Sequence, residues 1–152
     1  MAWTNDLLAG LAAHLAAAGI GQWKPVGTYD PASAVPAITL RTLPDRPDRA
    51  IALDLFADVD ADDAGLADVL AAVQIQTRGT RDPSDVDDLA DAIWDRLHGA
   101  QMLTLDTGPA AVHTTLIRRR SSDRLGADEH GRYLRSCNYY VNAARPNAYR
   151  PD

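Results

Sequence analysis

The segment 82–99 places the tightest limit on what this chain can fold into, because it predicts a helix with one apolar side. Asp82 is a good N-cap, and Pro83 falls at the first helical position, where its missing N–H costs nothing. Gly99 suits the position just after the helix. Apolar side chains recur with the spacing of one helical face at Val86, Leu89, Ala90, Ile93, Trp94 and Leu97. We expect a sheet to bury this face, and we expect Asp87, on the opposite side, to contribute little to stability.

A second helix is predicted near the N-terminus. Thr4 or Asn5 can cap it, and apolar side chains follow helical spacing at Leu8, Leu11, Ala12, Leu15 and Ala16. Gly19 and Gly21 end the pattern. Residues 22–36 contain three prolines, so we expect an ordered but irregular connection there.

Six segments predict strands, at 37–43, 50–57, 69–78, 101–106, 111–119 and 132–143. The last two are expected to form a long C-terminal hairpin, joined by the polar residues 121–131. The order α-β-β-β-α-β-β-β predicts an α+β fold, with one domain over 1–144 in which a mixed or antiparallel sheet is packed by two helices. Residues 145–152 contain two prolines and are predicted to form a flexible or partner-ordered tail.

Composition limits the class of protein further. The 152 residues are 46% hydrophobic and 24% charged, which is typical of a single globular domain and not of a disordered chain. No apolar run approaches the roughly 18 residues that span a bilayer, and no basic segment precedes an apolar block as in a secretory signal. A single cysteine, Cys137, excludes an internal disulfide and a cysteine zinc cage. The net charge of −6 gives no general attraction to nucleic acid.

The residue types that most often carry chemistry do not form a recognisable site. Asp58, Asp60, Asp62 and Asp63 alternate like the start of a calcium loop. Such a loop needs glycine at its sixth position and glutamate at its twelfth, but this chain has Asp63 and Val69 there. The four histidines have no metal-ligand spacing, and no Gly-x-Ser-x-Gly elbow is present. We therefore expect a non-enzymatic protein with no cofactor and no metal ion, and we interpret the aspartates as a solvated turn.

Charge is distributed unevenly along the chain. Residues 1–76 carry 10 acidic and 4 basic side chains, whereas residues 118–150 carry 8 arginines and 3 acidic side chains. Such polarity favours contact with an oppositely charged partner or with a second copy of the chain. The candidate interface residues are three arginines, three aspartates and two tyrosines: Arg118, Arg119, Arg120, Asp58, Asp60, Asp62, Tyr140 and Tyr149. The arginines either meet an acidic protein surface, such as segment 54–63 of a neighbouring copy, or contact passing DNA, or form a strand end that runs into solvent.

Several segments in this order resemble the tail terminator proteins of long-tailed bacteriophages, which are also called tail-to-head joining or minor capsid proteins. The resemblance is carried by the strand Val73-Gln74-Ile75-Gln76-Thr77-Arg78-Gly79 and by the helix that begins Pro83-Ser84-Asp85-Val86 and closes with Leu97-His98-Gly99. The N-terminal helix that ends near Gly19-Ile20-Gly21 fits as well.

The resemblance implies a structural virion protein. Members of this family form a ring, usually hexameric, that caps the finished tail tube and docks to head completion proteins, and they have no catalytic residues. The implied partners are copies of the chain itself, the tail tube protein and a head completion or stopper protein. The implied location is the head-tail junction of the virion, after synthesis in the cytoplasm of the bacterial host. The alternatives are a head-tail connector or stopper of the neck, and a non-viral small binding or adaptor module.

Overall fold

The computed structural model describes residues 2–58, 64–105 and 110–150, and it confirms the α+β fold class. Two helices and seven strands follow one another as α1 (Trp3–Ala17), β1 (Gln22–Trp23), β2 (Ala37–Leu40), β3 (Ala50–Asp58), β4 (Asp68–Arg78), α2 (Pro83–Leu97), β5 (Thr104–Leu105), β6 (Val112–Ala127) and β7 (Tyr133–Ala144). All seven strands join one sheet in the order β1-β2-β3-β4-β7-β6-β5. The pairs β1–β2 and β2–β3 are parallel, and the remaining pairs are antiparallel.

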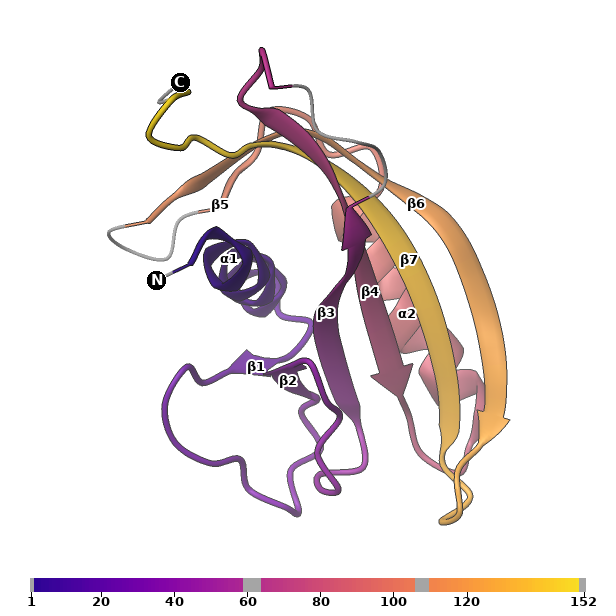
Figure 1. Cartoon of the computed structure of the whole chain (residues 1–152). Coiled ribbons are helices and arrows are strands. Elements are labelled where there is room, and N and C mark those ends of the chain that lie inside the picture. The colour runs from indigo at the N-terminus through magenta and orange to yellow at the C-terminus, as the bar shows by residue number, and fades with distance from the viewer. Residues whose placement is uncertain (1, 59–63, 106–109, 151–152) are drawn as a thin grey trace.

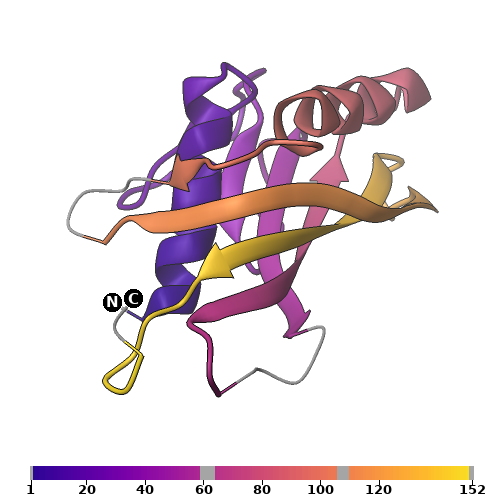
Figure 2. The same ribbon diagram turned by 90° about the horizontal axis from the view of Figure 1, so that it is seen from above.

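The sheet curls around the two helices, and one apolar core serves both of them (Figures 1 and 2). Helix α1 packs against β1, β2, β3, β5 and β6, whereas α2 packs against β4, β6 and β7. The largest buried side chains come from both helices and from the inner face of the strands: Leu7, Leu8, Leu11, Leu15, Ile38, Ile51, Leu53, Ile75, Ile93, Leu97 and Tyr139. The approach of α1 to β5 is close, since a Cβ at Gly10 would lie 2.7 Å from the Cβ of Leu105.

Helix α2 has the ends that the sequence predicts. The Asp82 carboxylate accepts a hydrogen bond of 3.0 Å from the Ser84 N–H, Pro83 stands at the first helical position, and Gly99 adopts φ +85° just beyond the helix. The apolar stripe is buried except at Trp94, which is 40% exposed, so the expectation for that residue is wrong. Trp94 instead stacks on His98, with ring centroids 5.0 Å apart, and the side chain that β6 places against its ring is Arg119 and not an apolar one.

The structure also gives Asp87 partners that argue against the expectation that this residue contributes little to stability. Its two carboxylate oxygens bridge two strands: Oδ2 lies 2.9 Å from a guanidinium nitrogen of Arg124 on β6, and Oδ1 lies 3.1 Å from one of Arg135 on β7. The Arg135 side chain is only 13% exposed, so removal of Asp87 would leave a half-buried cation without this partner. Periodicity placed Asp87 away from the core, but it could not show that the curled sheet would reach around the helix.

The predicted connection at 121–131 is mostly strand. Strand β6 runs on to Ala127, and only residues 128–132 form the turn, in which Asp128 Oδ1 accepts hydrogen bonds from the N–H groups of His130 and Arg132. Bulges after Thr114, Arg119 and Arg124 keep β6 paired with β7 along its length. A segment with polar side chains can continue a strand when its backbone pairs with a neighbouring strand and its side chains face solvent. The polar composition of this segment therefore gave the wrong boundary.

Smaller differences concern the ends of elements. Helix α1 begins at Trp3 with Ala2 as its N-cap, two or three residues before the predicted caps. Trp3 Nε1 donates a 3.0 Å hydrogen bond to the Ala144 carbonyl, which fixes the first turn to the end of β7. The irregular connection 22–36 begins with the two-residue strand β1, and the strand predicted at 101–106 is described only at Thr104–Leu105. Within the described residues, neither helix is long and apolar enough to cross a bilayer.

Replacing Ile93 with Asp tests how α2 packs. Ile93 is 1% exposed, so the carboxylate would be buried without a partner and should lower the free energy of unfolding by on the order of 4 kcal/mol. Asp95→Ala is the matched control, because Asp95 is exposed and has no ion pair among the described residues. Thermal melting of both variants gives the measurement, and an unchanged melting temperature for Ile93→Asp would contradict the assigned packing face.

Candidate subunit interface

Three side chains form a cationic cluster on the sheet face that points away from the helices. Strand pairing sets Arg118 opposite Tyr140, and the Arg118 guanidinium carbon lies 4.9 Å from the centre of the Tyr140 ring. The guanidinium carbon of Arg120 lies 5.7 Å from the same ring, and its Nε donates a 3.1 Å hydrogen bond to the tyrosine hydroxyl. Both arginines are exposed. Cation–π contact with one ring holds the two charges at a fixed place on the surface.

Arg119 does not belong to this cluster. It pairs with Tyr139 of β7, which lies in the core, and consecutive residues of a strand point to opposite faces. Its guanidinium carbon lies 5.8 Å from the Trp94 ring, and its backbone N–H donates a 3.0 Å hydrogen bond to His98 Nδ1. One of its terminal nitrogens is fully buried beside α2. The same alternation returns Arg120 to the outer face, so three consecutive arginines lie on two surfaces.

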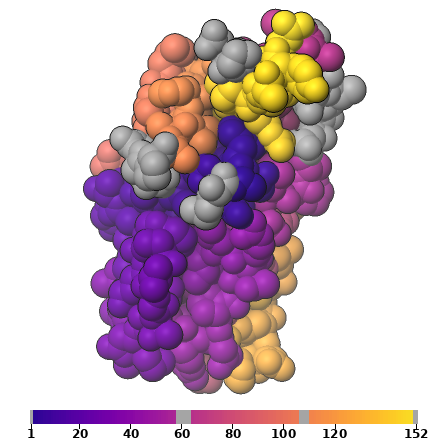
Figure 3. Space-filling model, turned by 60° about the vertical axis from the view of Figure 1, so that its left-hand side comes forward, coloured from indigo at the N-terminus to yellow at the C-terminus, as the bar shows by residue number. Residues whose placement is uncertain are grey.

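The other candidate interface residues lie elsewhere or outside the described part of the chain. Asp60 and Asp62 fall outside it, and Asp58 is described only as the last residue of β3. Tyr149 is 90% exposed in the C-terminal turn. This turn lies against the start of β4, since the Arg145 N–H donates to the Ala67 carbonyl at 2.8 Å and Arg150 Nε donates to that of Ala64 at 3.0 Å. Figure 3 shows these C-terminal residues, in yellow, beside the N-terminal ones, in indigo.

An acidic stripe on the outer side of α2 was missed as a candidate surface. Asp88, Asp91 and Asp95 are all exposed, and with Trp94, Ala92 and Arg119 they line an open hollow of about 660 Å³. The spacing i, i+3, i+7 that puts these aspartates on one line is visible in the sequence. The same spacing is typical of the solvated side of an amphipathic helix, so it does not by itself indicate a binding surface.

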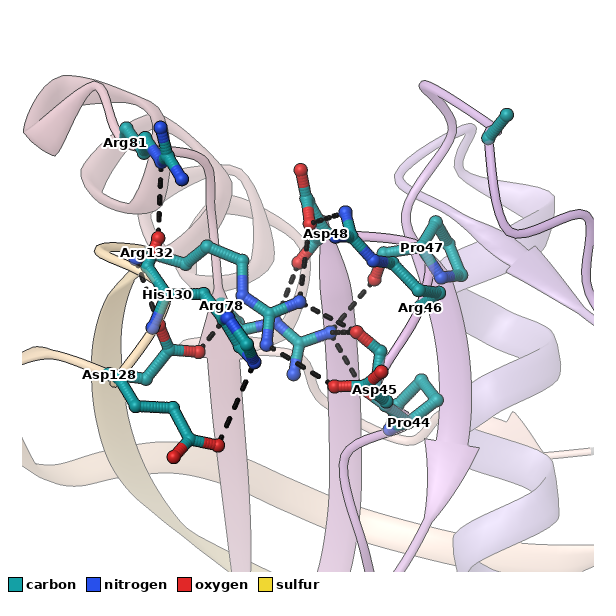
Figure 4. A network of polar contacts seen from close by, with 12 residues as sticks. Pro44, Asp45, Arg46, Pro47, Asp48, Arg78, Arg81, Asp128, His130 and Arg132 are labelled. Carbon is teal, nitrogen blue, oxygen red and sulfur yellow. Dashed lines mark hydrogen bonds and ion pairs between the residues drawn. The ribbon is translucent and has the colours of Figure 1, made fainter.

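Arg78 fastens the loop 44–48 to the end of β4 (Figure 4). The side chain is 4% exposed and donates to four backbone carbonyls: Nε to Asp48 at 2.7 Å, and one terminal nitrogen to Pro44 at 2.6 Å, to Pro47 at 2.8 Å and to Asp45 at 3.4 Å. Burial, and then the charge of neighbouring Arg132, lower the pKa of Arg78. Carbonyl oxygens thus replace the water that a buried guanidinium loses.

Arg132 fastens the same loop to the β6–β7 turn. One terminal nitrogen donates to the Asp45 carbonyl at 2.6 Å and to Asp48 Oδ1 at 3.2 Å, and Nε donates to Asp128 Oδ2 at 2.9 Å. Burial alone would raise the pKa of Asp128, but hydrogen bonds from the backbone of Arg132 and His130 and from the Arg132 side chain lower it. Arg78 and Arg132 therefore form a hub that joins three parts of the chain.

The hub borders an open polar hollow of about 420 Å³, lined by Arg46, Asp48, Thr80, Arg81, Asp82, His130 and Arg132. Its arginines already have partners: Arg46 pairs with Asp48 at 2.7 Å, and Arg81 Nε donates to the His130 carbonyl at 3.1 Å. The hollow is therefore suited to holding the loops in place and not to binding an anion. Across the part of the chain that the structure describes, no group of three or more His, Cys, Asp and Glu side chains is arranged to hold a metal ion.

Comparison with known proteins identifies the family. The model of the family described as "Bacteriophage tail terminator protein" matches residues 14–145, which is most of the chain. The chain belongs to the bacteriophage tail terminator family. This confirms the resemblance that the sequence segments indicated. A search of curated proteins finds no match.

The fold has a counterpart in a solved virion structure. A chain of the structure titled "Virion of native gene transfer agent (GTA) particle" matches with a TM-score of 0.55 at 16% sequence identity, over 70% of this chain and 78% of that chain. At this identity the likeness shows a shared fold. The family match and the shared fold support a structural protein of the phage tail or neck. Such a protein is associated with the virion and contacts its tail and head components.

The separate surroundings of the three arginines predict separate effects on stability. Arg119→Ser removes a half-buried side chain from Trp94 and should lower the free energy of unfolding by about 1–2 kcal/mol. The pair Arg118→Ser and Arg120→Ser removes only exposed charges and should change it by less than about 0.5 kcal/mol. Urea unfolding compares the two. Equal losses in the free energy of unfolding would mean that the Arg119 side chain contributes no more to stability than those of Arg118 and Arg120.

The hub predicts a second contrast. Arg78→Met keeps most of the side-chain volume but leaves the carbonyls of Pro44, Pro47 and Asp48 without this donor, which should cost about 3 kcal/mol. Arg46→Met on the same loop removes only an exposed ion pair and should cost less than about 1 kcal/mol. Thermal melting and the rate of proteolysis within residues 44–48 measure both. A normal melting temperature for Arg78→Met would show that the loop does not depend on this guanidinium.

Proposed function

We propose that this protein forms a closed ring, hexameric as is usual in the family, that caps the finished tail tube and joins the tail to the head. The observation that carries the proposal is the family match over residues 14–145. A closed ring leaves no growing end, so it can stop the addition of tube subunits while it presents a new surface to the head.

The geometry supports a structural role with repeated contacts. The chain carries an exposed cationic cluster on one side of its sheet and an acidic stripe on the helix that covers the other side. A surface of one sign cannot pair with its own copy, so these surfaces favour head-to-tail contacts, which close into rings. In this proposal the function needs no catalysis, cofactor or metal ion.

The proposed partners are copies of the chain, the tail tube protein and a head completion or stopper protein, with DNA passing through the ring. Arg118, Arg120 and Tyr140 are proposed to lie in the contact between subunits. Tyr149, in the segment that follows β7, is proposed to contact a neighbouring virion protein, and so are Asp58, Asp60 and Asp62. The protein is proposed to be made in the cytoplasm of the bacterial host before it joins the virion.

Deletion of the gene from its phage tests the function. We expect DNA-filled heads and separate tails, many of abnormal length, because nothing would stop growth of the tube. Negative-stain electron microscopy of lysates gives the count and the length distribution of tails, and expression of the wild-type chain in trans is the control. Separate tails of normal length would favour a connector or stopper of the neck, and normal tails attached to heads would refute both roles.

A further inference from the structure

The acidic stripe of α2 is unusual because its charges are not used within the chain. Three other aspartates of this segment have internal partners: Asp82 caps the helix, Asp85 lies 3.3 Å from Arg49, and Asp87 binds two arginines. In contrast, Asp88 and Asp95 have no ion pair among the described residues, and Asp91, 70% exposed, has one at 3.7 Å. Like charges at this spacing repel one another along a helix, so a cationic partner would relieve the repulsion.

The hollow beside the stripe has the chemistry of a guanidinium site. An exposed indole, Trp94, lies next to three carboxylates, and Ala92 between them leaves room for an incoming side chain. Arginine is the side chain that this combination favours, because its planar cation both stacks on aromatic rings and binds carboxylates through two donors. His98 and Arg119 already hold Trp94 in place, so the surface is preorganised.

The matching cations lie on the outer face of β6. In the part of the chain that the structure describes, Arg118 and Arg120 have no carboxylate partner, and their contacts are with the Tyr140 ring and hydroxyl. Contact with this ring limits the motion of both side chains, so less conformational entropy is lost when they bind. The two surfaces therefore carry opposite charges, and on each of them the charged side chains are exposed beside an aromatic side chain whose contacts hold it in place.

The two surfaces lie on opposite faces of the sheet. Arg118 and Tyr140 lie on the face away from the helices. Helix α2 packs on the other face (Figure 2), and the stripe lies on its solvent-exposed side, where Arg119 of β6 lines the same hollow. Contact between two unlike surfaces repeats from copy to copy, as a ring requires. We propose that the α2 stripe of one subunit, Asp88, Asp91 and Asp95 with Trp94, receives Arg118 and Arg120 of the next subunit. This inference rests on the proposed ring and names its contact.

Charge reversal with rescue tests the pairing. Asp88→Arg with Asp95→Arg, and separately Arg118→Glu with Arg120→Glu, should each raise the protein concentration at half-assembly by about tenfold or more, with melting temperatures close to wild type. The variant that carries all four changes should assemble again, because each reversed surface then meets a reversed partner. Native mass spectrometry measures the rings, and electron microscopy measures capping of purified tail tubes.

The acidic segment 54–63 is the alternative partner for Arg118 and Arg120 of a neighbouring subunit. Asp58→Arg, Asp60→Arg and Asp62→Arg together should leave assembly unchanged. Combining these three changes with Arg118→Glu and Arg120→Glu should not restore rings. Three outcomes would overturn the proposed pairing. The first is that the Asp58, Asp60 and Asp62 changes restore rings to the protein with Arg118→Glu and Arg120→Glu. The others are normal assembly of the Asp88→Arg, Asp95→Arg variant, and failure of the variant with all four changes to assemble. If wild-type protein formed no ring alone or on tubes, the proposed function itself would fail, whereas wild-type rings with an insensitive α2 variant would remove only this contact.

Discussion

The structure depends on the pairing of β4 with β7. All 11 residues of β4, from Asp68 to Arg78, pair with β7 from Ala144 back to Leu134. This ladder connects the middle of the chain to its C-terminal part, and the remaining strands add to it on both sides. Its inner face supplies Val73, Ile75 and Tyr139 to the core, so both helices depend on its register. A shift of one residue would move these side chains to the outer face.

The pairing of β4 with β7 also determines which side chains meet at the two ends of these strands and on their outer face. At one end it brings Arg78 and Arg132 close enough to bind a shared loop, and at the other it lets Ala144 accept the hydrogen bond that starts α1. On the outer face it places Tyr140 under two arginines. The bulges of β6 keep this strand paired with β7, and the alternation of side chains along β6 places Arg120 with Arg118 and not with Arg119.

The sequence predicted those features that depend on local physics. Helix α2, its caps and the position of β4 follow from neighbouring residues, and they were correct. The separation of Arg119 from Arg118 and Arg120 follows from the alternation of side chains along a strand. The exposure of Trp94 and the ion pairs of Asp87 were not predicted, because they depend on side chains that distant strands bring to α2. Likewise, a buried arginine such as Arg78 gives no local signal, since only the folded loop supplies its carbonyl partners. The acidic stripe had a visible spacing, but spacing alone cannot separate an unused surface from a binding surface.

Charged contacts suit the proposed role better than apolar ones would. A head-to-tail contact that does not close would produce filaments, so the proposed role needs contacts that favour closure. Interfaces rich in charge contribute specificity and association rate more than affinity, and exposed pairs are individually weak. In a closed ring every subunit uses both its cationic and its acidic surface, whereas the two end subunits of an open row each leave one surface unused. The additional contact favours the closed ring, even though each contact is weak. A tube end that aligns the subunits would further reduce the entropy lost on closure, which would couple assembly of the ring to completion of the tail.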